Sequence, residues 1–147
     1  MTFKNAVIIC LQKYVSIEGR AARSEYWYFF LFYVLVTFAL GPMDAMLMGN
    51  QAGVQPLSTL FGLAVVLPML TVGIRRLHDR DMNGWWMLLL LIPLVGSLAL
   101  LVIFVLPGTL GSNRFGPDPL GNDSTSTWSD EDDGVTAQSS IPRVDRE

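Results

Sequence analysis

The amino-acid sequence predicts an all-α membrane protein, with a short N-terminal amphipathic helix, three transmembrane helices and a disordered acidic tail. The composition is 51% hydrophobic and 16% charged, whereas soluble domains contain about 25% charged residues. Three long windows of the sequence contain no charged side chain. The charges are also divided unevenly, because residues 1–115 hold eight Lys or Arg against five Asp or Glu, and residues 116–147 hold two against eight.

Residues 1–15 predict an amphipathic helix that is too short to cross a bilayer. Apolar side chains recur at the spacing of one helix face, at Phe3, Val7, Cys10, Leu11 and Tyr14. The sequence leaves two placements open: the helix lies in the membrane interface, or it packs on the transmembrane helices. Cys10 is the only cysteine, so no intrachain disulfide can form.

The charge-free windows predict transmembrane helices over about residues 26–43, 57–74 and 85–106. A helix that crosses the hydrocarbon core needs about 20 apolar residues, within a range of about 17–25. None of the three shows the polar stripe of a helix on the surface of a soluble protein. The third contains Pro93 and Gly96, and we expect a single span kinked at Pro93. A re-entrant hairpin bent there is the alternative, although each arm alone would be too short to cross.

The distribution of Lys and Arg predicts the orientation. Four basic residues precede the first span, none lies between the first and second spans, and Arg75, Arg76 and Arg80 lie between the second and third. By the positive-inside rule, the N-terminus and residues 75–84 face the cytoplasm, and residues 45–55 lie outside. Three spans place the C-terminus outside, whereas a hairpin would return it to the cytoplasm.

The chain divides into a helical membrane domain, residues 1–119, and an acidic tail, residues 120–147. Gly, Pro, Ser, Asp and Asn dominate the tail, and apolar residues are few. Such a composition cannot bury enough apolar surface to offset the conformational entropy lost on folding. We therefore expect the tail to be disordered.

A charged cluster on the predicted cytoplasmic side is the candidate site. Glu25 lies in the first turn of the first span, where the helix dipole favours an anion. Antiparallel packing of the first two spans would bring it near the arginines that follow the second span. We expect an ion pair between Glu25 and Arg75, Arg76 or Arg80 at the membrane surface, contributing about 1 kcal/mol or less. The arginine side chains can also extend to lipid phosphates.

Metal binding and catalysis have weaker support in this cluster. A metal site would use His78, Asp79 and Asp81, but their spacing does not fit a metal site and the arginines repel a cation. Acid–base catalysis by His78 needs an orienting partner, and Asp79, adjacent in sequence, points elsewhere on a helix. The sequence has no nucleophile motif and no phosphate-binding glycine loop. We predict no catalytic residue, no metal and no cofactor.

Three motifs, "EGRAARSEYWYFFLF", "GIRRLHDRDMNGWW" and "PGTLGSNRFGPDP", resemble the domain of unknown function 805, a family of small bacterial inner-membrane proteins. The resemblance covers about residues 1–119 and excludes the acidic tail. It implies a polytopic protein of the bacterial inner membrane, and it implies no activity. The same motifs direct attention to Trp27, Gly84 and Trp85 beside the charged residues.

We expect a binding protein without enzymatic activity that engages itself, another membrane protein or anionic lipid, and no nucleic acid. The candidate binding residues are Arg20, Arg23, Glu25, Arg75, Arg76, His78, Asp79 and Arg80. Two alternatives stay open. One is a transport or channel component built by oligomerisation, with Asp44 or Glu25 in its lumen. The other is an enzyme that acts on a lipid-linked substrate through His78 and Asp79.

Overall fold

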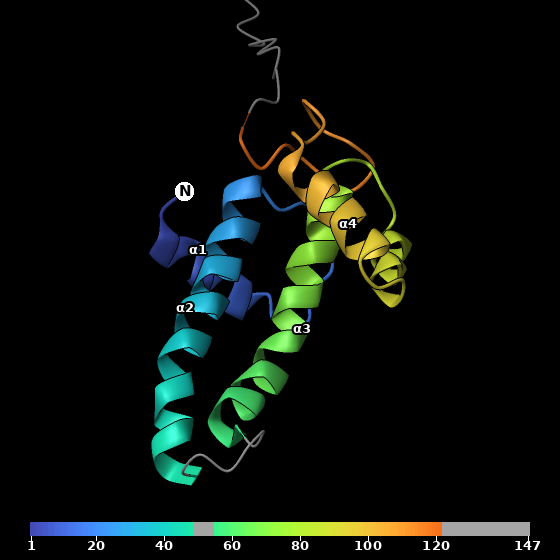
Figure 1. The fold of residues 1–147 in the computed structure, drawn as a ribbon. Helices are drawn as coiled ribbons and strands as arrows, with labels where there is room; N and C mark the ends of the chain where they lie inside the picture. The colour runs from blue at the N-terminus through green and yellow to red at the C-terminus, as the bar shows by residue number, and fades with distance from the viewer. Residues whose placement is uncertain (49–54, 122–147) are drawn as a thin grey trace, which may run out of the picture.

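The computed structural model describes residues 1–48 and 55–121. Along the chain, the helices are α1 (Phe3–Gln12), α2 (Arg23–Met48), α3 (Pro56–His78), the 3₁₀ helix η1 (Gly84–Leu91) and α4 (Val95–Val105). α2 and α3 form a long antiparallel hairpin, and α1 packs against both (Figure 1). η1 and α4 pack on each other and on α3. Nearly all of the predicted tail, and most of the predicted outer connection, lie outside the described residues.

α1 is capped at its start by Thr2, whose hydroxyl accepts a hydrogen bond from the Asn5 amide at 3.4 Å. Ala6 and Cys10 form its buried face, both with no exposed surface. Because α1 contacts α2 and α3, the structure has the second of the two predicted placements, in which this helix packs on the long helices.

α2 and α3 correspond to the first two predicted transmembrane helices. Among the described residues, two helices are long and apolar enough to cross a membrane, Arg23–Leu47 and Pro56–His78. α2 continues past its predicted end to Met48, and Pro42 lies inside the helix without ending it. The outer faces expose large apolar side chains, such as Phe38 at 81% and Leu60 at 68%. Soluble proteins rarely expose large apolar surfaces of this kind.

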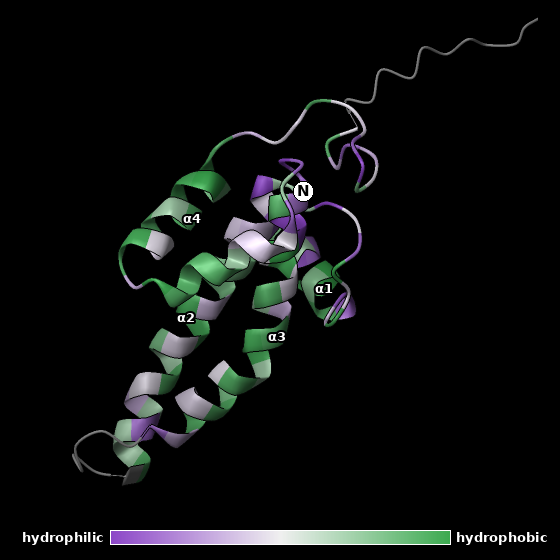
Figure 2. Ribbon diagram, turned by 90° about the vertical axis from the view of Figure 1, so that its right-hand side faces the viewer, coloured by the Kyte–Doolittle hydropathy of each residue, from purple (hydrophilic) through white to green (hydrophobic). Residues whose placement is uncertain are grey.

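Hydropathy is distributed unevenly over the molecule (Figure 2). Hydrophobic residues dominate α4 and much of α2 and α3, whereas hydrophilic residues gather where α1 and the connecting loops lie. This is the distribution expected of helices whose apolar surfaces contact an apolar layer while one end of the molecule meets water.

The far end of the α2–α3 hairpin is fixed by Asp44, which lies just beyond the predicted first span. Asp44 is 1% exposed. Its carboxylate accepts hydrogen bonds from the Leu57 amide at 2.8 Å, the Ser58 amide at 2.9 Å and the Ser58 hydroxyl at 2.7 Å. The first amides of a helix have no partner within that helix, and the N-cap residue Gln55 supplies none from its side chain. Asp44 therefore caps α3 from the neighbouring helix.

Residues 85–106 do not form the single kinked span that the sequence predicts. They form η1 and α4, joined by a turn at residues 92–94. Pro93 has no amide hydrogen to continue a helix, and Leu94 adopts a positive φ of 63° that redirects the chain. With 8 and 11 residues, neither arm is long enough to cross a bilayer. The prediction is corrected in favour of the hairpin alternative.

Gly96 allows the two arms of this hairpin to pack closely. A Cβ atom at Gly96 would overlap the backbone carbonyl of Leu89, so the position requires glycine. The hairpin returns the chain to the end of α3, where the Thr109 amide donates to the Asp79 carbonyl at 2.8 Å. The segment after α4, which a third span would place at the opposite end of the molecule, therefore lies beside the charged cluster.

The contact at Gly96 can be tested by replacing it with alanine. Gly96→Ala should destabilise the protein by about 1–3 kcal/mol, because the added methyl group forces the two arms apart. Thermal unfolding in detergent, followed by tryptophan fluorescence, measures the effect. Gly62→Ala is the matched control, since no atom lies within 4 Å of a Cβ atom added there. It should be neutral or slightly stabilising, and equal unfolding of both variants would contradict the hairpin packing.

Candidate functional site

The three sequence motifs meet at one end of the molecule (Figure 1). The first leads into α2, the second ends α3, and the third follows α4. The Ala21 amide of the first motif donates to the Arg75 carbonyl at 3.0 Å, in addition to the bond between the third motif and Asp79. We use the name motif cluster for five buried charged side chains at this junction, Arg20, Glu25, Arg75, Arg76 and Asp79.

Asp79 neutralises two arginines from different parts of the chain. Its Oδ1 atom accepts a hydrogen bond from Arg20 Nε at 2.9 Å and lies 2.9 Å from Arg20 Nη2. Its Oδ2 atom pairs with Arg76 Nη1. All three residues are at most 6% exposed. A buried charge without a partner carries a large free-energy cost, so this end of the fold depends on one carboxylate that serves both cations.

The predicted ion pair of Glu25 forms with Arg75, whose Nη1 lies 2.6 Å from Glu25 Oε1. The pair is buried, whereas a surface pair was expected. The contact lacks hydrogen-bond geometry, and Arg75 Nε and Nη2 also have no hydrogen-bond partner among the described residues. The Cys10 thiol donates to Glu25 Oε1 at 3.8 Å. Burial, followed by the charge of Glu25, raises the pKa of Cys10 to about 12, so the thiol stays protonated at neutral pH.

Two arginines of the motif cluster bind the backbone of α4 and of the segment that follows it. Arg20 donates to the carbonyls of Thr109 at 2.6 Å and Gly111 at 2.5 Å. Arg76 donates to the Phe104 carbonyl at 3.3 Å, near the end of α4. The last carbonyls of a helix have no partner within it, and cations are favoured there by the helix dipole. The arginines therefore fix the returning arm of the hairpin.

His78 packs against the third motif. Its ring stacks on Phe115 with centroids 3.9 Å apart and planes 3° apart, and Nδ1 lies 3.3 Å from the Gly19 carbonyl. Asp79 contacts the two arginines, so it does not orient the imidazole as acid–base catalysis would require. Within residues 1–48 and 55–121, no group of three His, Cys, Asp or Glu side chains is placed to hold a metal ion.

The structure sorts the predicted binding residues into two sets: Arg23 and Arg80 are not buried, whereas the other six are. Arg75 and Arg76 are fully buried. Because Arg75 pairs with Glu25, and Arg76 binds Asp79 and the Phe104 carbonyl, the expected contact of these two side chains with lipid phosphates is corrected. Arg23 is exposed and Arg80 is half-buried. Neither pairs with a carboxylate in the described part of the chain, and Arg80 Nε is buried there without a hydrogen-bond partner.

Only the hairpin alternative brought the third motif to the site, and the sequence did not identify which of its residues contribute. Thr109 and Gly111 supply carbonyls to Arg20, and the Asn113 side chain donates to the His78 carbonyl at 2.9 Å. The sequence features that indicate this contribution are the third motif itself and the turn at Pro93. The single-span prediction put this motif at the wrong end of the molecule.

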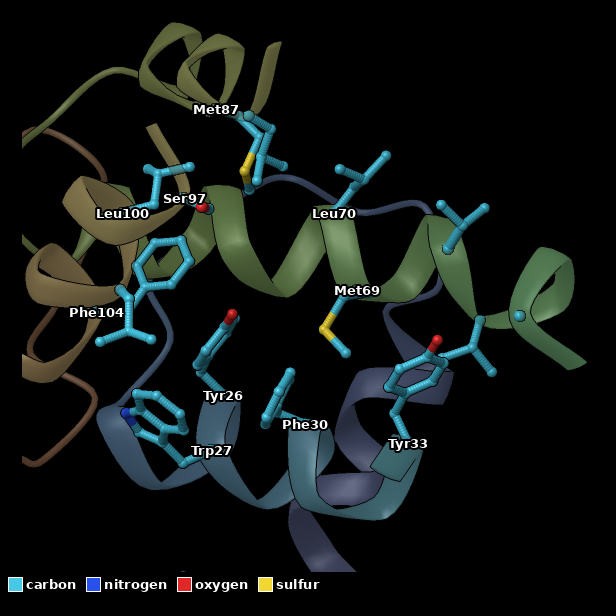
Figure 3. Close-up of a pocket in the computed structure, with 15 residues that line it drawn as sticks. Tyr26, Trp27, Phe30, Tyr33, Met69, Leu70, Met87, Ser97, Leu100 and Phe104 are labelled. Atoms are coloured by element: carbon cyan, nitrogen blue, oxygen red, sulfur yellow. The ribbon is translucent and has the colours of Figure 1, made fainter. Parts of the chain in front are cut away.

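An apolar cavity of about 440 Å³ lies next to the motif cluster, between α2, α3, η1 and α4 (Figure 3). Tyr26 and Phe30 of α2 point toward Met69 of α3 across it. Phe104 of α4, whose carbonyl accepts from Arg76, also lines it. The sequence does not predict this cavity, because one of its walls is the hairpin.

The chain is similar to known proteins over most of its described length. The family described as protein of unknown function (DUF805) matches residues 14–117. The chain belongs to DUF805. Two Escherichia coli (strain K12) proteins are similar to it. Inner membrane protein YhaH is 49% identical over 110 residues, which cover 74% of this chain and 91% of YhaH. Inner membrane protein YhaI is 45% identical over 109 residues, which cover 74% of this chain and 90% of YhaI.

The DUF805 match includes all five residues of the motif cluster and the whole hairpin, whereas α1 and the acidic tail lie outside it. No solved structure matches the chain. The predicted family, and the prediction of an inner membrane protein of unknown function with apolar helices, are confirmed.

The shared carboxylate of Asp79 can be tested against an exposed one. Asp79→Asn should lower the free energy of unfolding by about 3–5 kcal/mol, because it leaves two buried arginines without a counter-ion. Asp81→Asn is the matched control, since Asp81 pairs with Arg114 at 2.9 Å with both side chains about half exposed. That change should cost about 1 kcal/mol or less. Thermal unfolding in detergent gives both values, and similar losses would contradict the role assigned to Asp79.

Proposed function

We propose that this DUF805 protein binds anionic membrane lipid through Arg23 and Arg80. One observation carries the proposal: these are the two arginines among the candidate binding residues that no carboxylate of the described chain neutralises. A basic residue near a membrane surface attracts anionic headgroups by about 1 kcal/mol. The guanidinium group also matches the geometry of a phosphate.

We infer a multi-pass arrangement in which the N-terminus and the motif cluster face the cytoplasm. Arg75, Arg76 and Arg80 lie at the cluster end, and the hairpin adds Arg114, which pairs with Asp81. The sequence from residue 24 to residue 74, which includes the opposite end of the α2–α3 hairpin, has no Lys or Arg. The positive-inside rule supports this orientation, and the cytoplasmic leaflet carries the anionic lipids that Arg23 and Arg80 would meet.

No observation favours the two alternatives that the sequence left open. A pore would use Asp44 or Glu25 in its lumen, but Asp44 caps α3 and Glu25 pairs with Arg75 within one chain. An enzyme would need a second titratable group beside His78, whose contacts are with Phe115 and backbone. The absence of enzymatic activity stays a prediction, as do self-association and binding to another membrane protein.

Cysteine labelling tests the orientation and the hairpin together. In a Cys10→Ala background, Gln55→Cys and Ser112→Cys each introduce one exposed thiol, before α3 and after α4. A membrane-impermeant maleimide added to spheroplasts should label Gln55→Cys and spare Ser112→Cys, and inverted vesicles should give the reverse. Labelling of both thiols from the same side would contradict the hairpin, and a fully reversed pattern would contradict the orientation.

Lipid titration tests the binding proposal. Native mass spectrometry of the full-length protein in detergent measures its affinity for phosphatidylglycerol. Arg23→Gln and Arg80→Gln should each weaken binding about fivefold, which corresponds to about 1 kcal/mol for each arginine. Lysine at either position should retain most of the affinity, and added salt should weaken it.

Arg114→Gln is the matched control for this titration, because Arg114 is already paired with Asp81 and its loss should change the affinity little. Salt-insensitive binding that survives both glutamine variants and is lost in His78→Ala would overturn the proposal and bring the enzyme alternative forward.

A further inference from the structure

The cavity beside the motif cluster has the size and lining of a site for an apolar ligand. Its volume of about 440 Å³ falls in the range of about 300–1,000 Å³ found for small-molecule sites. Gly62 of α3 lines it, and no atom lies within 4 Å of a Cβ atom added there. Met69 and Met87 also line it (Figure 3), and the flexible thioether side chain adapts to occupants of irregular shape.

The lining and the surroundings of the cavity favour a hydrocarbon chain as its occupant. Its walls are mostly apolar, with polar atoms only on a few lining side chains, such as Tyr26, Trp27 and Ser97 (Figure 3). Because an ordered water needs about two to four hydrogen-bond partners, these walls favour an apolar occupant over water. The hairpin that borders the cavity exposes apolar side chains on its outside, with Leu91 at 78% and Leu98 at 62%. In a membrane these surfaces contact acyl chains, which are also the molecules available to enter the cavity.

One end of the cavity lies close to the unpaired arginines. Trp27 lines the cavity near the start of α2 (Figure 3), and Arg23 lies four residues earlier on the same helix face. Phe104, on another wall, is bonded through its carbonyl to Arg76, which lies four residues before Arg80 in the sequence. The start of α2 adds the positive end of a helix dipole to the positive charge of these arginines. A ligand that matches both the apolar cavity and this positive charge has an apolar chain and an anionic headgroup.

We propose that the cavity holds one acyl chain of an anionic phospholipid whose headgroup lies at Arg23 and Arg80. The inference rests on the proposed function for the headgroup, and on the cavity for the chain. Arg23 and Arg80 select the charge of the lipid, whereas Gly62 leaves the space in which the chain lies.

Photolabelling of the full-length protein in nanodiscs tests the chain site. The nanodiscs contain phosphatidylcholine and a small fraction of phosphatidylglycerol that carries a diazirine in its acyl chain, and peptide mass spectrometry locates the label after irradiation. The label should fall on residues that line the cavity, such as Met69 and Met87. Gly62→Leu should remove most of this labelling, because the new side chain fills the cavity.

Gly41→Leu is the matched control. Gly41 lies in α2, away from the residues that line the cavity, and no atom lies within 4 Å of a Cβ atom added there either. Labelling of this variant should equal that of the wild type. Wild-type labelling of Gly62→Leu, or a label spread equally over the cavity and the outer face of α2, would overturn the chain site.

A second probe separates the chain site from the proposed function. Arg23→Gln should lower cavity labelling by the phosphatidylglycerol probe about fivefold, and it should leave the weaker labelling by a matching phosphatidylcholine probe unchanged. If Gly62→Leu has no effect while Arg23→Gln still weakens lipid binding, the chain site is wrong and the proposed function stands. If Gly62→Leu removes the label while headgroup charge and Arg23 have no effect, the chain lies in the cavity and the proposed function is wrong.

Discussion

The carboxylate of Asp79 is the contact on which the charged end of the fold depends. It is buried between Arg20, from the segment before α2, and Arg76 of α3. Those arginines in turn bind backbone carbonyls at and after the end of α4. Removing one member of such a network leaves a charge in an apolar environment. Gly108 fits the same constraint, because a Cβ atom there would overlap the Asp79 carboxylate. The three sequence motifs are therefore parts of one buried network.

Neighbouring arginines of identical chemistry have different roles because the end of α3 falls between them. Arg75 and Arg76 lie in the last turns of the helix, where they are packed against carboxylates and carbonyls. Arg80 follows the helix and has no carboxylate partner in the described chain. The number of basic residues predicts an orientation in the membrane, but only burial distinguishes an arginine that stabilises the fold from one that is available to a ligand.

The two long helices, and a pair between Glu25 and one of Arg75, Arg76 and Arg80, could be predicted because simple rules indicate each of them. Length and hydropathy indicate the helices, and the helix dipole with antiparallel packing indicates the pair. The hairpin was predicted only as the alternative to a single span, since residues 85–106 have the length and hydropathy of one span. The deciding contacts are non-local: Gly96 against the Leu89 carbonyl, and arginines from other segments on the returning arm. The cavity could not be predicted, because its walls come from four elements whose packing depends on such non-local contacts.

The hairpin also gives the molecule an uneven cross-section. Near the motif cluster, α1, η1 and α4 lie around α2 and α3, whereas at the Asp44 end α2 and α3 are the only helices that the structure describes (Figure 1). The described part of the protein is therefore wider at the end of the motif cluster than at the Asp44 end. If α2 and α3 cross the bilayer as proposed, the protein displaces more lipid from one leaflet than from the other, because arms too short to cross remain on the side from which they enter. A membrane that bends to give the wider end more area accommodates this shape with less distortion of its lipids.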